Sequence, residues 1–291
     1  MTILLTGATG FLGSHLLKKL VELKHNVVIL KRSTSDTWRI KTLLTKVVSY
    51  DIDKVAIEKP FQDQKIDVVI HTVTNYGRGK DNIASIVDTN LMFSLKLLET
   101  AAFFNTDTFF NTDTLLYKYL NHYSLSKKQF AEWLKYFSDK IKVVNLKLEH
   151  MYGPKDDDTK FVTWIIKQML QNVPSIDLTE GKQKRDFIYI DDIVDVYMLM
   201  LDKSKNFKAF SEFDVGTGTQ IELKEFILKI RNEISKIKRV DSKLNFGTKA
   251  YRDGEFMEIE EDVEPLFSLG WKPKYTIEDA IKNTLKDIEN D

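Results

Sequence analysis

An apolar strand that runs directly into a glycine turn, and from there into a helix, opens this chain. Residues 3–6 form the apolar run, and Gly7, Gly10 and Gly13 follow it at three-residue spacing. Leucines recur behind the turn at helical spacing, and a second apolar run at residues 27–30 completes a strand–helix–strand unit. In such a unit the glycines let a pyrophosphate approach the backbone at the positive end of the helix. The pattern predicts a dinucleotide site; the alternative is a turn that binds nothing, because turns also use glycine for local reasons. The residues expected to contact the cofactor here are Gly7, Thr9, Gly10, Phe11 and Leu12.

The same strand–helix alternation continues through the first half of the chain. Strands rich in Val and Ile, each followed by a helix, are typical of a parallel sheet covered on both faces. We therefore predict an α/β fold, a Rossmann-like doubly wound parallel sheet with a smaller, interleaved C-terminal substrate-binding lobe. The expected strands are residues 3–6, 27–30, 47–50, 67–71, 108–111 and 143–148, and the expected helices between them are residues 13–23, 81–104 and 123–138.

The rhythm changes after Gly153 and Pro154, where helices become more frequent than strands. We expect residues 1–150 to form the NADP-binding domain, with return segments near residues 186–215. Residues 151–185 and 216–291 are expected to form the second lobe. The elements expected in this half are helices at residues 159–172, 193–201, 223–237 and 277–288, and short strands at residues 187–190 and 213–215.

Composition narrows the possible partners. The 291 residues include 43 basic and 43 acidic side chains, so nothing indicates a nucleic-acid or acidic-membrane partner. The chain has no cysteine, which excludes disulfides, thiolate zinc sites and a cysteine nucleophile, and no metal site is expected. No run approaches the roughly 18 apolar residues of a membrane helix, and a strand starting at residue 3 leaves no room for a signal peptide. We expect a cytoplasmic protein.

A basic loop after the second strand indicates which dinucleotide binds. NAD-binding units place an acidic side chain there to accept hydrogen bonds from the ribose hydroxyls, whereas this chain has Lys31, Arg32 and Ser33. A guanidinium can grip a ribose phosphate in a fork. The loop therefore predicts NADP(H), with Arg32 as the main contact; the alternative is a solvated basic loop. Asp51 and Ile52, after the third strand, are expected to bracket the adenine, although an Asp in a turn is often structural.

Tyr123 and Lys127 lie one helical turn apart and so share a helix face. A neighbouring ammonium stabilises phenolate and lowers the tyrosine pKa from its reference value of about 10, which makes the phenol a usable acid or base near neutrality. Tyr136 and Lys140 have the same spacing. We favour the first pair, because it opens an amphipathic helix, whereas the second lies at that helix's far end.

Polar residues at the end of the strand at residues 108–111 supply a candidate hydroxyl. Thr112 or Thr114 beside the tyrosine would hold a reacting oxygen in line and share its developing charge. Asp113 lies between them. The alternative is a capped strand-to-loop turn, which Asn, Thr and Asp all favour.

Taken together, these motifs resemble the extended short-chain dehydrogenase/reductases that act on nucleotide sugars, the NAD-dependent epimerase/dehydratase family. The resemblance implies that Tyr123 donates or accepts a proton at the sugar oxygen, that Lys127 binds the nicotinamide ribose, and that Thr112 is the third catalytic residue. It also implies that Arg185 and Arg252 contact the diphosphate. The matching segments are residues 7–13, 69–71, 90–99, 123–127, 148–154, 185–192, 213–218, 252–255 and 269–271.

Departures from the family pattern refine this resemblance. Sugar 4,6-dehydratases carry Thr-Asp-Glu where this chain has Thr112, Asp113 and Thr114, so the base for dehydration is missing. Most relatives have Asn at the position of His150, which either hydrogen-bonds the sugar or diphosphate or is a satisfied core histidine. The shortened segment between Thr112 and Tyr123 leaves both threonines as candidates for the catalytic hydroxyl.

The same departures resemble a smaller group, the CDP-abequose and CDP-paratose synthases. This resemblance implies reduction by NADPH of the 4-keto group of a nucleoside-diphosphate 6-deoxy or 3,6-dideoxy hexulose, CDP-linked in that group. The alternatives are a 4-epimerase with tightly bound NAD and a non-catalytic dinucleotide-binding protein. Since relatives often dimerise through paired helices, a homodimer is one expectation. The resemblance adds His71, Tyr123, Lys127 and His150 as cofactor contacts, and Tyr76, Arg78, Asp113, Glu149, His150, Lys160, Phe161, Arg185 and Arg252 as substrate contacts.

Overall fold

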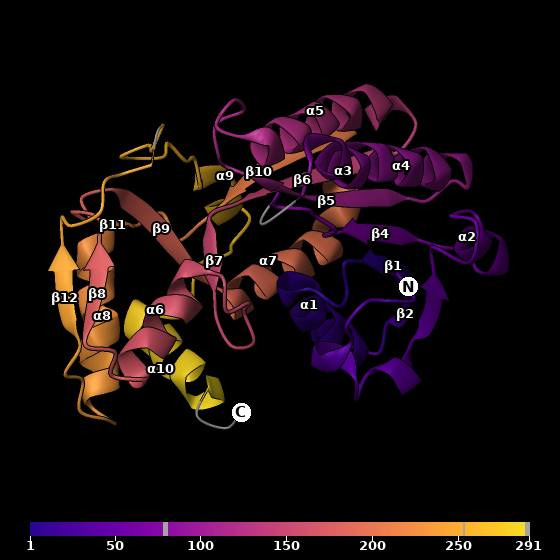
Figure 1. The fold of residues 1–291 in the computed structure, drawn as a ribbon. Coiled ribbons are helices and arrows are strands. Elements are labelled where there is room, and N and C mark those ends of the chain that lie inside the picture. The colour runs from indigo at the N-terminus through magenta and orange to yellow at the C-terminus, as the bar shows by residue number, and fades with distance from the viewer. Residues whose placement is uncertain (78–80, 253, 289–291) are drawn as a thin grey trace. The chain divides into compact units, whose positions relative to one another are not determined.

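A computed structural model describes residues 1–77, 81–252 and 254–288 of the chain (Figure 1). The chain divides into two compact units. Unit 1 comprises Met1–Leu148 and Val194–Asp214, and unit 2 comprises Glu149–Ile193 and Val215–Asp291. The chain passes between the units three times, so the second unit is interleaved with the first.

Unit 1 is built on a seven-stranded sheet with the order β10-β6-β5-β4-β1-β2-β3. The strand β1 lies between β2 and β4 and pairs with both in parallel, which is the arrangement of a doubly wound sheet. The predicted parallel sheet is confirmed, and all six strands expected in the first half are present. The strands are β1 (Thr2–Thr6), β2 (Asn26–Lys31), β3 (Val48–Asp51), β4 (Val68–His71), β5 (Thr108–Thr114), β6 (Lys142–Leu148) and β10 (Phe210–Val215).

Helices connect these strands, because parallel neighbours need a crossover connection. The segment expected as one helix at residues 81–104 consists of three pieces, since a π-helical stretch at Asp88–Phe93 separates two α-helices. The α-helices are α1 (Phe11–Glu22), α2 (Lys59–Asp63), α3 (Ile83–Val87), α4 (Ser94–Phe103), α5 (His122–Tyr136) and α7 (Ile190–Lys203), the last of which begins in unit 2 and continues into unit 1. Short 3-10 turns are η1 (Trp38–Ile40), η2 (Leu44–Lys46), η4 (Phe137–Asp139) and η5 (Ser204–Asn206), and the π-helical stretch is η3 (Asp88–Phe93).

One hydrophobic core of unit 1 lies between the sheet and helices α4 and α5. Leu4, Val69 and Phe109 come from three adjacent strands, and Leu98 and Phe130 come from these two helices. All five are completely buried. Burying such a side chain stabilises the fold by about 1.5–3 kcal/mol, so this cluster holds α5 firmly on the sheet.

Unit 2 contains two small sheets, of order β11-β9-β7 and β12-β8. The rings of Phe187 on β9 and Phe226 on α8 stack with their centroids 3.7 Å apart. The sequence indicated only the strand that became β9, because the other strands of this unit are three or four residues long and lack a clear alternation. The elements are β7 (His150–Tyr152), α6 (Phe161–Leu170), β8 (Ser175–Leu178), β9 (Lys184–Tyr189), β11 (Gln220–Glu222), α8 (Leu223–Ser235), β12 (Lys243–Phe246), α9 (Glu264–Phe267) and α10 (Ile277–Ile288).

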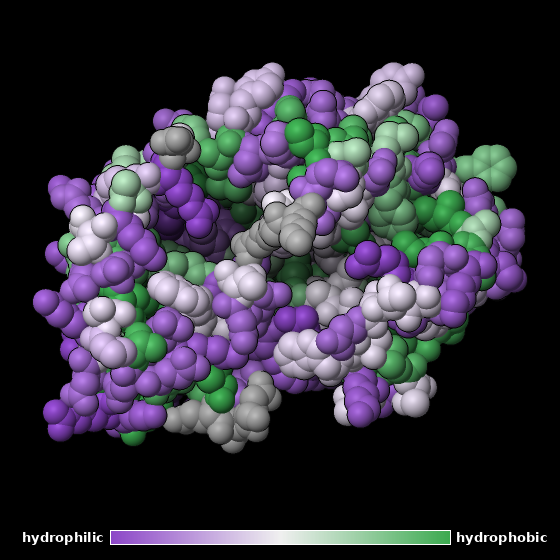
Figure 2. Space-filling model, in the orientation of Figure 1, coloured by the Kyte–Doolittle hydropathy of each residue, from purple (hydrophilic) through white to green (hydrophobic). Residues whose placement is uncertain are grey.

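The surface is mixed in character. On the face drawn in Figure 2, hydrophilic residues are spread over both units, with apolar residues in smaller groups between them. Within the part of the chain that the structure describes, none of the helices has the length and apolar character that spanning a membrane requires.

Candidate active site

The glycine turn follows β1, and its glycines have different roles. Gly7 has a φ of +71°, and a Cβ atom there would overlap the side chain of Thr72. A Cβ atom on Gly13 would overlap the carbonyl group of Gly7, so these two glycines are required by the packing of the turn itself. A Cβ atom on Gly10 would meet only the Gly7 carbonyl oxygen, at 3.3 Å. Protein atoms leave the other side of Gly10 open, as expected where a pyrophosphate approaches the backbone.

The N-terminus of α1 is suited to an anion. Gly10 is its N-cap residue, no side chain caps the first turn, and that turn contains no acidic residue. The first amide groups of a helix carry partial positive charge and lack partners within the helix. The side chain of Leu12 is buried and that of Phe11 packs edge-on against His15, so both would serve a cofactor through their backbone. These residues fit a dinucleotide diphosphate.

The basic loop at residues 31–33 is only partly available to a phosphate. Lys31 forms an ion pair with Asp51 that holds the pKa of that carboxyl below its usual range. The backbone amide of Ser33 donates to Asp53 at 2.7 Å, and its hydroxyl also donates to that carboxylate. Asp51 thus binds a lysine of its own chain, and the predicted contribution of Lys31 and Ser33 to phosphate binding is reduced. Ile52 packs against the core of unit 1.

Two arginines remain near this loop. Arg32 is exposed, and among the residues that the structure describes its guanidinium has no ion pair. Arg39, which we did not predict, is half-buried in η1 and its Nη1 lies 3.4 Å from the carbonyl oxygen of Thr9 in the glycine turn. Its guanidinium also lies 4.4 Å from the centre of the Trp38 ring. Its proximity to the glycine turn is a consequence of tertiary folding, since thirty residues separate Arg39 from Thr9.

Helix α5 carries Tyr123 and Lys127. Asn121 and Ser124 form a capping box: the Asn121 side chain accepts from the Ser124 amide at 2.9 Å, and the Ser124 hydroxyl accepts from the Asn121 amide at 3.1 Å. The Tyr123 ring lies 5.0 Å, centroid to centroid, from the ring of Tyr76, which we predicted as a substrate contact. The structure therefore brings these two residues together. Arg78, a second predicted contact, lies outside the described residues.

Lys127 is almost completely buried, with 2% of its surface exposed. Burial lowers its pKa from 10.5 to about 8; the nearby charge of Asp113 opposes this shift and that of Lys128 adds to it. The competing pair differs, because Tyr136 is 67% exposed and Lys140 lies beyond the end of α5. Only the first pair combines a tyrosine with a lysine buried in the protein.

Asn90 joins three elements around α5. It lies in the π-helical stretch, is fully buried, and donates to the Asn75 carbonyl oxygen at 2.8 Å and to the Ser126 hydroxyl at 3.0 Å. Its side-chain oxygen accepts from the Asn75 amide at 2.7 Å. Ser126 lies between Tyr123 and Lys127, so Asn90 fixes α5 against the segment that follows β4. The resemblance included Asn90 without assigning it this role.

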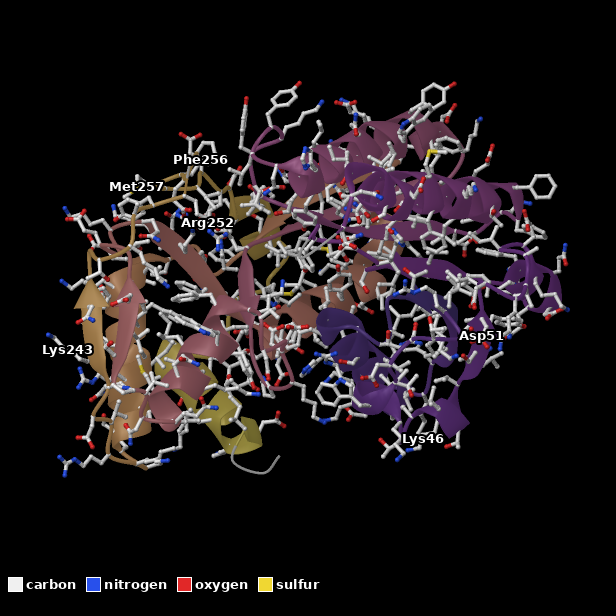
Figure 3. The ribbon with its side chains drawn as sticks, viewed as in Figure 1. Lys46, Asp51, Lys243, Arg252, Phe256 and Met257 are labelled. Atoms are coloured by element: carbon white, nitrogen blue, oxygen red, sulfur yellow. The ribbon has the colours of Figure 1, made fainter. Side chains whose placement is uncertain are left out.

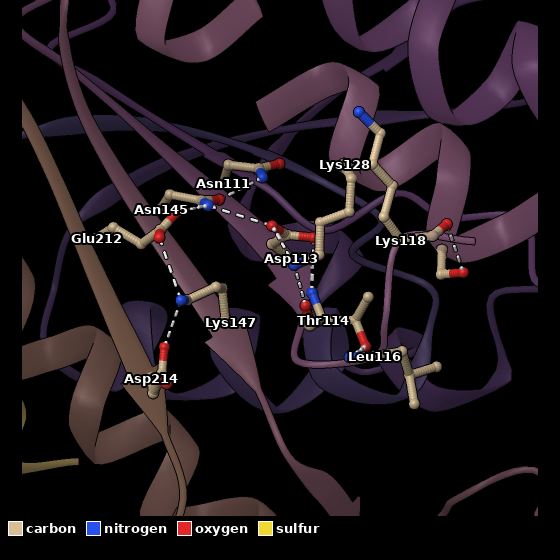
Figure 4. Close-up of polar contacts among 11 residues, drawn as sticks. Asn111, Asp113, Thr114, Leu116, Lys118, Lys128, Asn145, Lys147, Glu212 and Asp214 are labelled. Carbon is tan, nitrogen blue, oxygen red and sulfur yellow. Dashed lines mark hydrogen bonds and ion pairs between the residues drawn. The ribbon is translucent and has the colours of Figure 1, made fainter. Parts of the chain in front are cut away.

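Asp113 is part of a buried polar network rather than a free carboxylate (Figure 4). Its side chain is 1% exposed and lies 3.2 Å from both Lys128 Nζ and Asn145 Nδ2. It also accepts from the backbone amide of Thr114 at 2.7 Å. The network continues from Asn145 to Glu212 at 2.8 Å. The carboxylate of Asp113 is thus engaged by protein donors, and its contact with substrate stays a prediction.

The two candidate threonines have different surroundings. The Thr112 hydroxyl lies 2.5 Å from the hydroxyl of Tyr197 on α7. Since neighbouring residues of a strand point to opposite faces, Thr112 faces α7 whereas Asp113 faces α5. The Thr114 hydroxyl accepts a hydrogen bond from the Leu116 amide at 3.2 Å. Thr114 is buried, with 7% of its surface exposed, whereas Thr112 is only partly buried. Within the described residues, the structure shows no contact of Thr112 or Thr114 with Tyr123.

His71 is completely buried at the end of β4. Its Nδ1 lies 2.8 Å from the Thr6 hydroxyl and its Nε2 lies 2.8 Å from the Ser94 hydroxyl. Burial and the charge of Lys127 hold the pKa of His71 well below its usual range. We expected His71 to contact the cofactor, but both ring nitrogens are engaged by protein, so only its backbone is available for that purpose.

In unit 2, Glu149 and His150 form a pair. Glu149 Oε2 lies 2.8 Å from His150 Nδ1, and the Glu149 side chain is 1% exposed whereas that of His150 is 38% exposed. Within the described part of the chain, Glu149 Oε1 has no hydrogen-bond partner. The carboxylate accepts the Nδ1 proton and leaves Nε2 as the accessible end of the ring. His150 is thus the more accessible of the two side chains, and Glu149 is held by its contact with His150.

The two arginines expected to bind a diphosphate also differ. Arg185 on β9 is 10% exposed at its side chain and pairs with Glu255, so a diphosphate would have to share or displace that carboxylate. Arg252 is exposed on the segment before α9, near Phe256 and Met257 (Figure 3).

Two further predicted substrate contacts lie at the start of α6. Lys160 is the N-cap residue of α6, and Phe161 begins that helix with its ring centroid 6.1 Å from that of Trp164. The described residues of unit 1 and unit 2 contain no group of three or more side chains arranged to hold a metal ion.

Comparison with known proteins agrees with this geometry. The model of the "NAD dependent epimerase/dehydratase family" matches residues 3–216, which include the glycine turn, the threonines at the end of β5 and the Tyr123/Lys127 pair. The chain belongs to this family. It is therefore an NAD(P)-dependent enzyme of the short-chain dehydrogenase/reductase type, as its motifs predicted.

Two relatives within the epimerase/dehydratase family are similar along nearly their whole length. The CDP-abequose synthase of Salmonella muenchen is 36% identical over 97% of this chain and 96% of the relative. The CDP-abequose synthase of Salmonella typhimurium is 31% identical over 98% of both chains.

Solved structures of this family share the fold. The UDP-glucuronic acid 4-epimerase of Bacillus cereus, in complex with UDP-glucuronic acid and NAD, is 25% identical with a TM-score of 0.84, over 100% of this chain and 99% of that chain. The UDP-glucose 4-epimerase of Thermotoga maritima, solved with UDP-glucose, is 22% identical and also has a TM-score of 0.84, over the same shares of both chains.

Proposed function

We propose that the chain is an NADPH-dependent reductase of the 4-keto group of a nucleoside-diphosphate 6-deoxy or 3,6-dideoxy hexulose, with a CDP-linked sugar as the preferred substrate. The observation that carries this proposal is the pairing of Tyr123 with a buried Lys127 in a chain 36% and 31% identical to two CDP-abequose synthases. The names of those relatives supply the CDP-sugar class, and the residues of unit 1 supply the chemistry.

Reduction of a ketone requires a proton at the oxygen. Tyr123 gives its phenolic proton to the C4 oxygen as negative charge develops there, and it regains a proton from solvent. Lys127, with a pKa of about 8, is mostly charged at pH 7 and so stabilises the phenolate that forms. Thr112 or Thr114 holds the carbonyl oxygen by a hydrogen bond. Bound NADPH supplies the hydride to C4.

Preference for NADPH follows from the arginines near the end of β2. A 2′-phosphate would bind to Arg32, whose guanidinium has no ion pair in the described structure, and Arg39 lies beside the glycine turn. Lys31 contributes less, because it already pairs with Asp51.

The polar network around Asp113 supports a reductase over a dehydratase. Dehydration needs an acid and a base at the sugar, whereas this chain has Thr114 at one of the two positions and a carboxylate engaged by Lys128 and Asn145 at the other. Neither position offers a free carboxylate for the elimination of water.

Loss of NADPH absorbance with a panel of nucleotide-linked 4-keto sugars tests the proposal. CDP-linked 3,6-dideoxy and dTDP- and GDP-linked 6-deoxy substrates should be compared side by side. We expect turnover with at least the CDP-linked ketone, and Tyr123→Phe should lower kcat by roughly 10²–10⁴-fold because the proton donor is lost. Full activity of Tyr123→Phe, or no turnover with any ketone of the panel, would contradict the proposal.

A 4-epimerase is the second candidate, because solved structures with the same fold include NAD-bound 4-epimerases. An epimerase would retain NAD through purification and interconvert two sugars without net consumption of NADPH. Mass spectrometry of the cofactor released from the purified protein separates the two activities.

A further inference from the structure

Tyr197 is a completely buried tyrosine that the proposed mechanism does not use. It lies on the part of α7 that belongs to unit 1, and its residue surface is 0% exposed. Its hydroxyl lies 2.5 Å from the Thr112 hydroxyl, and within the described chain this is its hydrogen-bond partner. A buried hydroxyl without a partner destabilises the folded state, so the pair is not incidental to the packing.

The direction of the shared proton follows from the surroundings of the two hydroxyls. A phenol is more acidic than an aliphatic alcohol and is therefore the better donor. Burial raises the pKa of Tyr197, so the phenol keeps its proton at any pH at which the enzyme works. Because Thr112 is the hydrogen-bond partner of Tyr197, the phenolic proton forms a hydrogen bond only when it points at Thr112 Oγ1. Tyr197 is thus the donor and Thr112 the acceptor.

The proton of Thr112 is then free to point elsewhere. Thr112 is only partly buried, and within the described residues Tyr197 is the hydrogen-bond partner of its hydroxyl, so the Thr112 proton is not taken up by a protein acceptor there. A hydroxyl that accepts one hydrogen bond becomes a better donor of the next, because hydrogen bonds in a chain polarise one another. The Thr114 hydroxyl has no such support from a phenol; it accepts from the backbone amide of Leu116.

We infer that Tyr197 is a positioning residue, which fixes the Thr112 hydroxyl and directs its proton toward the carbonyl oxygen of the sugar. This inference rests on the proposed reductase function. It also assigns the catalytic hydroxyl to Thr112 rather than Thr114, a choice that the sequence left open.

Tyr197→Phe tests the assignment, because it removes one oxygen and keeps the buried ring. With NADPH and the CDP-linked 4-keto sugar, we expect kcat to fall about tenfold while KM for both reactants stays within twofold, since a lost transition-state interaction lowers kcat. The Kd for NADPH, measured by its fluorescence, should be unchanged. Tyr152→Phe is the matched control, since Tyr152 is a buried phenol on β7 that donates to the Ile277 carbonyl oxygen at 3.5 Å. It should retain wild-type kcat.

A double-mutant cycle with Thr112→Val makes the test decisive. If Tyr197 acts through Thr112, the Thr112→Val/Tyr197→Phe double variant has the same kcat as Thr112→Val alone. Additive losses in the cycle, or a wild-type kcat for either single variant, would overturn the inference. Loss of activity on Thr114→Val with full activity of Thr112→Val would do the same.

Two variants separate the role of Tyr197 from the proposed reductase activity. Tyr123→Phe reports on the reductase, because it removes the proton donor. If Tyr123→Phe is inactive while Tyr197→Phe is fully active, only the role of Tyr197 is wrong. If no keto sugar of the panel is reduced by the wild-type enzyme, the proposed function itself fails.

Discussion

At the scale of single residues, the side chain to which we assign a role in reactivity also lowers stability. Lys127 is kept charged near neutral pH in a place where only 2% of its surface meets solvent. Burial disfavours that charge, and the pKa of about 8 measures the balance between burial and the nearby Asp113. A lysine on the protein surface would keep its charge without cost but would stand too far from a phenol to influence it.

We predict that Lys127→Met raises stability and abolishes turnover. The charged form of Lys127 is disfavoured in the folded state by a pKa drop from 10.5 to about 8, which corresponds to roughly 3 kcal/mol. The wild-type protein carries this cost below pH 8. Between about pH 8 and 10.5 the unfolded chain binds the extra proton, so wild-type stability rises and the difference from the variant shrinks. Thermal melting of both proteins at pH 7 and pH 10 measures this; a lower Tm for Lys127→Met at pH 7 would contradict it.

The proposed preference for NADPH also rests on single residues. We predict that Arg32→Ala raises KM for NADPH about tenfold and leaves KM for NADH unchanged, because only NADPH carries the 2′-phosphate. Lys46→Ala, which removes an exposed positive charge at the end of η2, is the control and should change neither value. Initial rates with both cofactors provide the measurement, and an equal loss with NADH would contradict the assignment of Arg32.

At the scale of elements, the ends of helices carry the function. The N-terminus of α1 is left uncapped by side chains, which suits an anionic ligand, whereas the N-terminus of α5 is closed by a capping box. The contrast has a physical reason: α1 offers its free amides to a ligand, and α5 must be rigid because Tyr123 lies in its first turn. Asn90 adds a second fixed point through Ser126 in the same helix.

We therefore predict that Asn121→Ala costs about 1 kcal/mol of stability and lowers kcat as well. Asn82→Ala is the matched control, since Asn82 caps α3 by accepting from the Ser85 amide at 2.8 Å. Both variants should melt a few degrees below the wild type, but only Asn121→Ala should lose turnover. Equal kcat values for the two variants would show that the start of α5 does not position Tyr123.

At the scale of the whole molecule, the two units differ in the chemistry that they carry. Unit 1 contains the glycine turn, the basic loop and the Tyr123/Lys127 pair, and unit 2 contains His150 and the arginines of β9 and the segment before α9. Because the chain crosses between the units three times, neither unit is a contiguous stretch that a simple truncation would isolate.

Cofactor binding should stabilise the whole chain. A ligand that binds only the folded protein adds about 2.7 kcal/mol at a concentration 100 times its Kd, which corresponds to a rise in Tm of several degrees. We predict that NADPH raises Tm more than NADH does at equal concentration. Thermal melting with each cofactor measures the difference, and a larger rise with NADH would favour the epimerase.

Local pattern was enough to predict the sheet of unit 1. Strands β1, β2, β4, β5 and β6 contain apolar runs that are buried in the sheet. The glycine turn is recognisable because Gly7 and Gly13 are required by contacts within a few residues along the chain or at the adjacent strand end. The short strands of unit 2 were not predictable, because three- and four-residue strands depend on partners distant in sequence.

The sequence by itself determined the order of the strands in the first half of the chain, the glycine turn and the spacing of Tyr123 and Lys127, since each of these is set by residues close along the chain. Only the tertiary structure decided which polar side chains remain available. It engaged Asp113 with Lys128, His71 with Thr6 and Ser94, and Lys31 with Asp51, and it brought Arg39 to the glycine turn and Tyr197 to Thr112. The physical reason is that a buried polar group must find its partner wherever the fold places one, and that partner is often far away in sequence.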